Sequence, residues 1–223
     1  MTTYSDMYTR IGDEIQDASL TTQVQRAIQD AIAVYEPTRF YFNQTIAQFS
    51  TVANQEYYTV ADFADIPLLI TIDSLLLRIM GIDRPIQAED FGEMDRAQTR
   101  VWYGPPRAFA YYNEQLRLYP IPDQAYLLTM SYHHRLTPLA LATDTNAWMV
   151  DGEMLIRQTA KAYLAIDVLQ EAGIAQGAQM MADMALQRLQ KETRKRRSNP
   201  FLKTDVPIST AWHSGWVRSG ETW

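Results

Sequence analysis

The chain has 223 residues, enough for one good hydrophobic core or two small ones, so we expect one domain or a compact two-part domain. Its 47% apolar and 21% charged content is ordinary for a soluble globular protein, and no apolar run approaches the roughly 20 residues that span a bilayer. The formal net charge of -6 argues against a surface dominated by nucleic-acid contacts, and the lack of cysteine excludes disulfides, thiolate zinc sites and cysteine nucleophiles. The opening MTTYSDMYTRIGDE has no basic stretch followed by an apolar one, so we expect cytoplasmic synthesis without secretion.

Two helices are expected before residue 38. The first carries apolar side chains at helical spacing at Tyr4, Tyr8, Ile11 and Ile15. The second has an apolar stripe that stops before Pro37, and Thr22 with Gln25 three residues later has the pattern of a capping box.

From Phe40 the pattern changes to that of β-strands. Two runs, FYFNQTIAQFSTV (40–52) and EYYTV (56–60), are rich in aromatic and β-branched residues. Residues 53–55 between them have the pattern of a turn, so the sequence predicts a β-hairpin. LLITIDSLLLRIMG (68–81) is expected to form a further strand pair. The polar stretch that opens at Pro85 predicts a short surface helix near residues 86–99, anchored by Phe91 and Met94.

Residues 108–134 have the pattern of an antiparallel meander. AFAYY (108–112) and QLRLY (115–119) flank the turn residues Asn113 and Glu114, and the corner PIPDQ (120–124) precedes AYLLTMSYHH (125–134). Each strand should have one buried side, because apolar residues alternate at Leu116 and Leu118, and again at Tyr126, Leu128, Met130 and Tyr132.

Two antiparallel helices joined by a tight turn are expected after Asp151, with Gly173 as an interruption. The first has a stripe flanked by Tyr163 and made of Leu155, Thr159, Ala162, Ile166 and Leu169. The second continues with Met181, Met184, Ala185 and Leu189.

The run KETRKRR (191–197) concentrates positive charge at Lys191, Arg194, Lys195, Arg196 and Arg197. Cations at a helix C-terminus interact favourably with the macrodipole, which is one explanation of this run. Contact with a phosphate backbone or with an acidic partner surface is the other.

Residues 198–223 have proline, glycine and serine punctuation, no sustained period, and three of the five tryptophans. Solvated tails are poor in large aromatic residues, whereas segments that order on binding use tryptophan as an anchor. We therefore expect an extended docking arm, rather than an untidy terminus or one folded back on its own domain, with anchors at Phe201, Leu202, Trp212, Trp216 and Trp223.

No catalytic, cofactor-binding or metal-binding constellation is found. His133 and His134 would point to opposite faces of a strand, so one of them is expected in the core or an interface, and His213 stands alone. A pair of carboxylates can catalyse glycoside hydrolysis, but it needs a cleft and one raised pKa. The candidate carboxylates lie in polar stretches, so we expect them on solvated surfaces; they are Asp62, Asp65, Glu89, Asp90, Glu93 and Asp95. Nucleotide-binding and hydrolase motifs are absent, and Gly104 to Arg107 has the pattern of a strand-entry turn. An interaction protein without enzymatic activity is predicted.

Several stretches resemble the head-to-tail adaptor proteins of tailed bacteriophages: TYSDMYTRIGDEI, TTQVQRAIQDAIAVYEPTRFYFNQT, FSTVANQEYYTV, LRLYPIPDQAYLLTMSY and WMVDGEMLIR. The resemblance runs from about residue 3 to about residue 195 and rests on the order and texture of the elements. It implies an α+β fold in which residues 1–37 and 150–197 form a helical bundle. Residues 38–136 would be an inserted antiparallel β-rich subdomain, sandwich-like or barrel-like, and residues 198–223 the arm.

The resemblance also implies a structural virion protein at the head-tail junction, assembled in the host cytoplasm. Its expected partners are the portal protein, a tail or nozzle protein, further copies of itself in a ring of usually twelve, and passing genomic DNA, with no membrane. The basic run would then lie near DNA or against an acidic portal surface. Two alternatives stay open: a glycan-binding or receptor-binding β-module on a helical oligomerisation platform, and a hydrolase that uses the acidic cluster Glu89, Asp90, Glu93 and Asp95 on the short helix.

Overall fold

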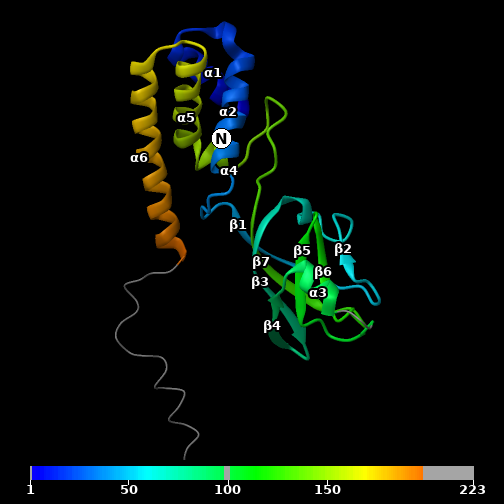
Figure 1. Ribbon diagram of the computed structural model, residues 1–223. Coiled ribbons are helices and arrows are strands. Elements are labelled where there is room, and N and C mark those ends of the chain that lie inside the picture. Colours follow the sequence, from blue (N-terminus) through cyan, green and yellow to red (C-terminus); the bar gives the residue numbers. More distant parts are fainter. Residues whose placement is uncertain (1, 98–100, 198–223) are drawn as a thin grey trace, which may run out of the picture.

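The computed structural model describes residues 2–97 and 101–197, and it has helices at one end and a curled β-sheet at the other (Figure 1). Two segments, 36–43 and 135–146, join the helical part to the sheet part. The predicted α+β class is confirmed. The domain boundaries that the sequence suggested stay a prediction.

The helical part is built from both ends of the chain. Its elements are α1 (Tyr4–Ile15), the 3-10 turn η1 (Ala18–Leu20), α2 (Thr21–Tyr35), α4 (Ala147–Val150), α5 (Glu153–Asp167) and α6 (Ala172–Arg197). Their buried faces share one core, which includes Met7, Ile11, Val24, Ile28, Phe40, Trp148, Leu155, Ile156 and Leu189. The N-terminal helices are therefore stabilised by helices that lie more than 100 residues later in the sequence.

The capping box lies at a different helix from the one predicted. Thr3 accepts a 3.2 Å hydrogen bond from the Asp6 N–H, and the Asp6 carboxylate accepts one of 2.8 Å from the Thr3 N–H, so the box starts α1. The box expected at Thr22 is wrong, because α2 begins at Thr21, directly after η1, with Leu20 as a cap that makes no side-chain hydrogen bond.

Small residues, and not the methionines, form the inner face of α6. Ala175, Ala178, Ala182, Ala185 and Leu189 are buried, whereas Met181 and Met184 are 38% and 50% exposed. Gly173 lies inside α6 and does not interrupt it. On α5 the predicted stripe holds at Leu155, Thr159 and Ala162, but Ile166 is 59% exposed because Leu164 and Ala165 take the inward positions there. Alanine brings two helix backbones close together, so α5 and α6 pack through their small side chains.

Seven strands form one curled mixed sheet in the order β1-β7-β3-β4-β5-β6-β2. Their bounds are β1 (Gln44–Ser50), β2 (Tyr57–Tyr58), β3 (Leu69–Ile79), β4 (Ile82–Ala88), β5 (Ala108–Tyr112), β6 (Gln115–Tyr119) and β7 (Leu127–His134), with a 3-10 turn η2 (Ile66–Leu68) before β3. The β-rich part was expected to be antiparallel, and one pair of strands differs, because β4 and β5 are parallel. The two edges of the sheet approach each other, since the Val52 N–H donates a 3.1 Å hydrogen bond to the Tyr58 hydroxyl.

The hairpin predicted between residues 40 and 60 does not form. β1 pairs with β7, and β2 pairs with β6 at the other edge of the sheet. Between them the chain follows the proline corner, because the Thr51 N–H donates to the Tyr126 carbonyl at 2.9 Å and the Asn54 N–H to the Pro122 carbonyl at 2.8 Å. These bonds carry the chain from one edge of the sheet to the other.

The stretch 68–81 forms one strand in place of the predicted pair. β3 continues through two irregularities in its register and turns at Met80 and Gly81, which both have positive φ, to pair with β4. Pro85 therefore lies in a strand, and the predicted helix begins only at α3 (Phe91–Ala97). Its predicted anchors are confirmed, because Met94 is buried and Phe91 packs beside it.

The predicted meander holds for one pair of strands. β5 and β6 form a hairpin whose turn residues, Asn113 and Glu114, both have positive φ, as a type I′ turn requires. β6 does not continue to β7, because the corner at Pro120 and Pro122 carries the chain to a position between β1 and β3. The expected buried residues are confirmed at Leu116, Leu118, Tyr126, Leu128, Met130 and Tyr132. The expectation of a single buried side is wrong at Arg117 and His133, which are also buried, so the alternation breaks at these two positions.

Candidate interaction surfaces

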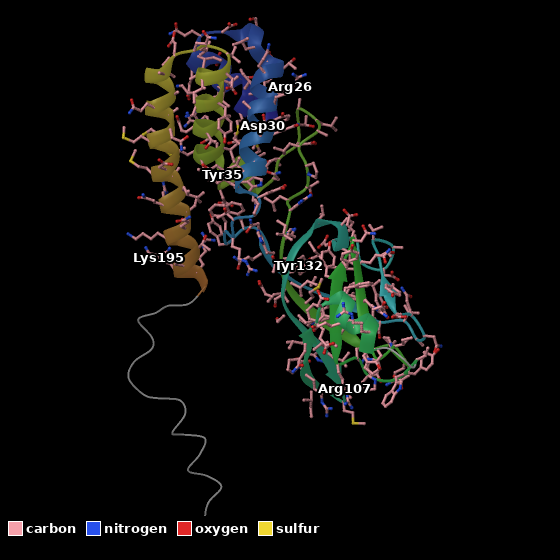
Figure 2. All side chains as sticks on the ribbon, viewed as in Figure 1. Arg26, Asp30, Tyr35, Arg107, Tyr132 and Lys195 are labelled. Atoms are coloured by element: carbon pink, nitrogen blue, oxygen red, sulfur yellow. The ribbon has the colours of Figure 1, made fainter. Side chains whose placement is uncertain are left out.

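The predicted basic run forms the C-terminal end of α6. Lys191, Arg194 and Lys195 are exposed, and within the described ranges no ion pair forms with any of these three. Figure 2 shows Lys195 on the part of α6 that extends beyond the other helices. A surface hollow of about 450 Å³ is lined by Arg188, Lys191, Glu192, Lys195 and Arg196. We call Arg188, Lys191, Arg194, Lys195 and Arg196 the basic end.

Arg188 is a member of this surface that the sequence reasoning missed. It lies three residues before Lys191 and seven before Lys195, so all three share one side of the helix. Looking for basic residues at helical spacing, and not only in an unbroken run, would have found it.

Arg196 differs from the other basic residues because it is engaged within the chain. Its guanidinium forms a 2.8 Å ion pair with Glu192 and lies 3.7 Å from the centre of the Tyr41 ring. Burial, followed by the hydrogen bond with Asp151, raises the pKa of Tyr41 to about 12. Tyr41 belongs to the segment that joins the helices to the sheet, so Arg196 fixes the end of α6 to that segment.

Thr193 makes a second attachment at the same place. Its hydroxyl accepts a 3.2 Å hydrogen bond from the Tyr41 N–H and donates one of 2.8 Å to the Leu189 carbonyl. Thr193 is buried although it lies in the middle of a charged run. One side of the end of α6, with Thr193 and Arg196, therefore contacts the joining segment 36–43 through Tyr41. We call the other side, which carries the exposed Lys191, Arg194 and Lys195, the outer side of the basic end. The side chain of Arg197 and the predicted arm residues Phe201, Leu202, Trp212, Trp216 and Trp223 lie outside the described residues.

Ion pairs also involve the two joining segments, 36–43 and 135–146, which together make the junction. Arg39, in the first joining segment, pairs with Asp73 on β3, and Arg135 in the second segment lies 3.5 Å from Glu36. His133 is 1% exposed beside this junction, which confirms that one histidine of the pair is buried. Burial and then the nearby Arg39 lower the pKa of His133. A neutral buried histidine is a packing residue here.

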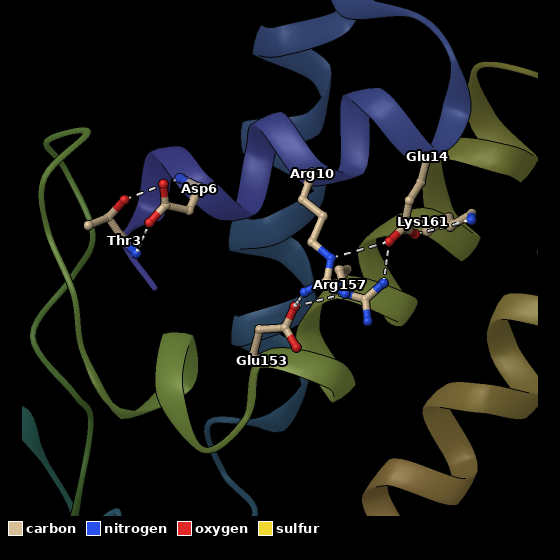
Figure 3. Close-up of polar contacts among 7 residues, drawn as sticks. All are labelled: Thr3, Asp6, Arg10, Glu14, Glu153, Arg157 and Lys161. Atoms are coloured by element: carbon tan, nitrogen blue, oxygen red, sulfur yellow. Dashed lines mark hydrogen bonds and ion pairs between the residues drawn. The ribbon is translucent and has the colours of Figure 1, made fainter. Parts of the chain in front are cut away.

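A network of charges fixes α1 against α5 (Figure 3). Arg157 donates to Glu153 at 2.8 Å and also to Glu14, while Lys161 lies 3.2 Å from Glu14 and Arg10 lies 3.2 Å from Glu153. Cations and carboxylates alternate, so every charge in the network has at least one oppositely charged neighbour. The arrangement orients two helices and offers no free nucleophile or base.

An apolar groove runs along the outer side of α5 and α6, with a volume of about 580 Å³. We call it the α5–α6 groove, and its lining residues are Ala162, Tyr163, Ile166, Ala172, Ala175, Gln176, Gln179, Met180 and Asp183. Ile166 and Met180 are 59% and 62% exposed. The sequence placed Ile166 in the core, and it did not predict a groove.

The acidic residues near α3 occupy the solvated positions that the sequence suggested. Asp90 caps α3 by accepting a 2.9 Å hydrogen bond from the Gly92 N–H, and Asp95 pairs with Arg117 at 3.3 Å. Glu89 and Glu93 are exposed. Across residues 2–97 and 101–197, no three histidine or carboxylate side chains are grouped so that they could hold a metal ion. Within the same ranges, no helix has both the length and the apolar character that crossing a membrane requires.

The sequence was compared with known proteins and with models of protein families. A search of curated protein sequences gave no match. The model of a protein family described as SU10 adaptor protein matches residues 2–204, which is most of the chain. This match covers the helices at both ends and the whole sheet between them. The chain therefore belongs to the SU10 adaptor family of phage head-tail adaptor proteins, as the resemblance in its sequence had indicated.

Proposed function

We propose that this adaptor forms a ring, of twelve copies as the sequence resemblance implies, that joins the portal to the tail and lines the DNA channel. In this proposal the protein is assembled in the host cytoplasm and acts without enzymatic activity. Residues 198–223 extend from the basic end as an arm that docks on the portal.

The observation that carries this proposal is the free outer side of the basic end. Within the described ranges, Lys191, Arg194 and Lys195 are exposed and unpaired, and they project from the one helix that continues beyond its neighbours. Cations held on a fixed helix attract a phosphate backbone or an acidic protein surface without any sequence-specific contact. The net charge of the chain is -6, so positive charge is concentrated at the basic end while the rest of the subunit is acidic.

The junction also supports a structural role. The hydroxyl of Thr193 and the ring of Tyr41 hold the basic end against the segment that leads into the sheet. A load applied at the end of α6 is therefore transmitted directly to the sheet part. A connector between two large assemblies needs this rigidity.

Charge reversal tests the proposal. Arg194→Glu together with Lys195→Glu should reduce both ring formation on the portal of the same phage, seen by electron microscopy, and the retention of DNA in packaged heads. Arg26→Glu is the matched control, because Arg26 is exposed on α2, away from α6 (Figure 2). If both readouts are unchanged in the double variant, the basic end serves only the helix dipole of α6.

The glycan-binding alternative has one observation in its favour, a set of exposed apolar side chains at the far end of the sheet. We call this set the distal tip, and its members are Met80, Ile82, Val101, Trp102 and Tyr103. β4 runs parallel to β5, so the turn before β4 lies at the end where β5 begins, and Figure 2 places Arg107 there, far from the helices.

In the adaptor function, the distal tip is a contact surface for the tail protein. Trp102→Ala should then weaken tail attachment and leave the ring on the portal intact. Binding of the unaltered chain to a glycan array, lost in Trp102→Ala while tail attachment persists, would favour the receptor-binding module instead.

A further inference from the structure

The α5–α6 groove is an apolar surface that no described segment of the chain covers. Its floor is formed by the buried Ala162 and Ala175, and its walls by the exposed side chains of Ile166 and Met180. Its volume of about 580 Å³ falls within the roughly 300–1,000 Å³ of pockets that hold drug-sized ligands. Methionine is flexible and polarisable, so the wall at Met180 adapts to bulky aromatic side chains.

The same chain carries a segment with large apolar side chains after α6. Residues 198–223 contain Trp212, Trp216 and Trp223. Large aromatic side chains gain more free energy from burial than any others, and an apolar groove is also stabilised when it is covered. Tryptophan side chains bound in the α5–α6 groove would remove both apolar surfaces from water.

The length of the chain decides which residues of this segment reach the groove. The lining residue nearest to the end of α6 is Asp183, which lies 14 residues before Arg197, or about 21 Å along the helix. Trp212 comes 15 residues after Arg197, so an extended chain reaches about 50 Å. Leu202 comes only five residues after Arg197 and reaches about 17 Å, which is too short. The tryptophans can reach the groove, and Phe201 and Leu202 cannot.

The charges at the rim agree with this arrangement. Asp183 lines the groove at the side that faces the end of α6. Arg218 follows Trp216 by two residues, which allows it to approach the Asp183 carboxylate when the indole of Trp216 is in the groove.

We propose that the α5–α6 groove binds the tryptophan-bearing C-terminal segment of its own chain, with Trp212 and Trp216 as anchors, in the unassembled subunit. Docking covers both apolar surfaces until a partner takes up the segment. The docking is a property of the isolated chain, whereas its release by the portal rests on the proposed function.

A nitroxide label on the full-length chain tests the docking. The sequence has no cysteine, so Ser214→Cys gives a single labelling site between the two anchor tryptophans. The label should broaden the backbone amide NMR signals of Tyr163, Ile166 and Met180, and leave that of Met80 at the distal tip sharp. Adding Ile166→Glu and Met180→Glu should remove this broadening, and both positions are exposed enough to accept the change without unfolding.

Two controls match these variants. Met184→Glu changes an exposed methionine of α6 that does not line the groove, and Phe201→Ala changes an aromatic residue that is too near α6 to reach it. Broadening should persist in both. Broadening that survives Ile166→Glu with Met180→Glu, or that is equal at Met80, overturns the proposal.

A mixed sample identifies the occupant. Isotope-labelled chain without nitroxide is combined with unlabelled chain that carries it, and the signals of the groove should stay sharp. Broadening in the mixed sample would mean that the segment comes from a second copy, which contradicts docking within one chain. Ring formation on the portal is read separately by electron microscopy, so failure of the docking leaves the proposed function standing.

Discussion

Thr193 offers the most direct test of how the basic end is held. In Thr193→Val the shape of the side chain is kept, but the Tyr41 N–H loses its 3.2 Å acceptor and the Leu189 carbonyl loses a 2.8 Å donor. A buried polar group left without a partner costs about 1–3 kcal/mol. The carbonyl keeps its helical role, so most of the cost comes from the Tyr41 amide, and we expect a loss of about 2 kcal/mol in the free energy of unfolding.

Urea unfolding followed by circular dichroism measures this loss, and hydrogen exchange at the Tyr41 amide shows where it occurs. Thr193→Ser is the control, because it keeps both hydrogen bonds and removes one buried methyl group, at about 1 kcal/mol. The Tyr41 amide should exchange faster in the valine variant and at an unchanged rate in the serine variant. If valine is as stable as threonine and the amide remains protected, the end of α6 is not held through this hydroxyl.

Further predictions concern packing and capping. Gly152→Ala should cost about 1–3 kcal/mol in the free energy of unfolding, because a Cβ there would lie 2.8 Å from the Trp148 ring, while Gly177→Ala, with nothing within 4 Å of its Cβ, should stabilise α6 by about 0.5–1 kcal/mol. Thermal unfolding of the two variants separates these opposite signs. Hydrogen bonds from Thr3 lower the pKa of Asp6, so its carboxylate stabilises the folded state above the unfolded pKa, and this contribution is lost as pH falls through the folded pKa. Asp6→Asn should flatten the acid side of a stability-pH profile, and an unchanged slope below about pH 4 would contradict the capping role.

Sequence patterns predicted which faces are buried better than which strands are neighbours. The alternation at Leu116 and Leu118 identified two buried side chains, because alternation marks one face of a pleated strand, but it did not predict that Arg117 between them is buried as well. The partner of β1 is β7, about 80 residues later, and local spacing carries no information about such a pairing. The turn at Asn113 and Glu114 was predictable because both of its strands are adjacent in the sequence.

The exposed methionines of α6 show a different limit. Hydrophobicity favoured Met181 and Met184 for the core, but close helix packing selected Ala178 and Ala182, which are small. Which of two apolar stripes faces inward depends on the distance between helices, and that distance is a property of the fold. The α5–α6 groove was missed for the same reason, since Ile166 was assigned to the core.

For the candidate site, the sequence located the basic end correctly as the last turns of a helix, and it missed Arg188. It gave no sign that Arg196 is engaged with Tyr41, because the two residues are 155 positions apart (196 − 41) and meet only through the fold.

The construction of the helical part from both ends of the chain has a consequence for synthesis on the ribosome. The strands from β1 to β7 are complete once His134 has emerged, so the sheet can close before α5 and α6 have left the ribosome. α1 and α2 are made first and yet must wait, because their buried faces pack against residues as late as Leu189. Until then, the apolar stripe of α2 is open to water, and this interval is when a chaperone would protect the nascent subunit from aggregation.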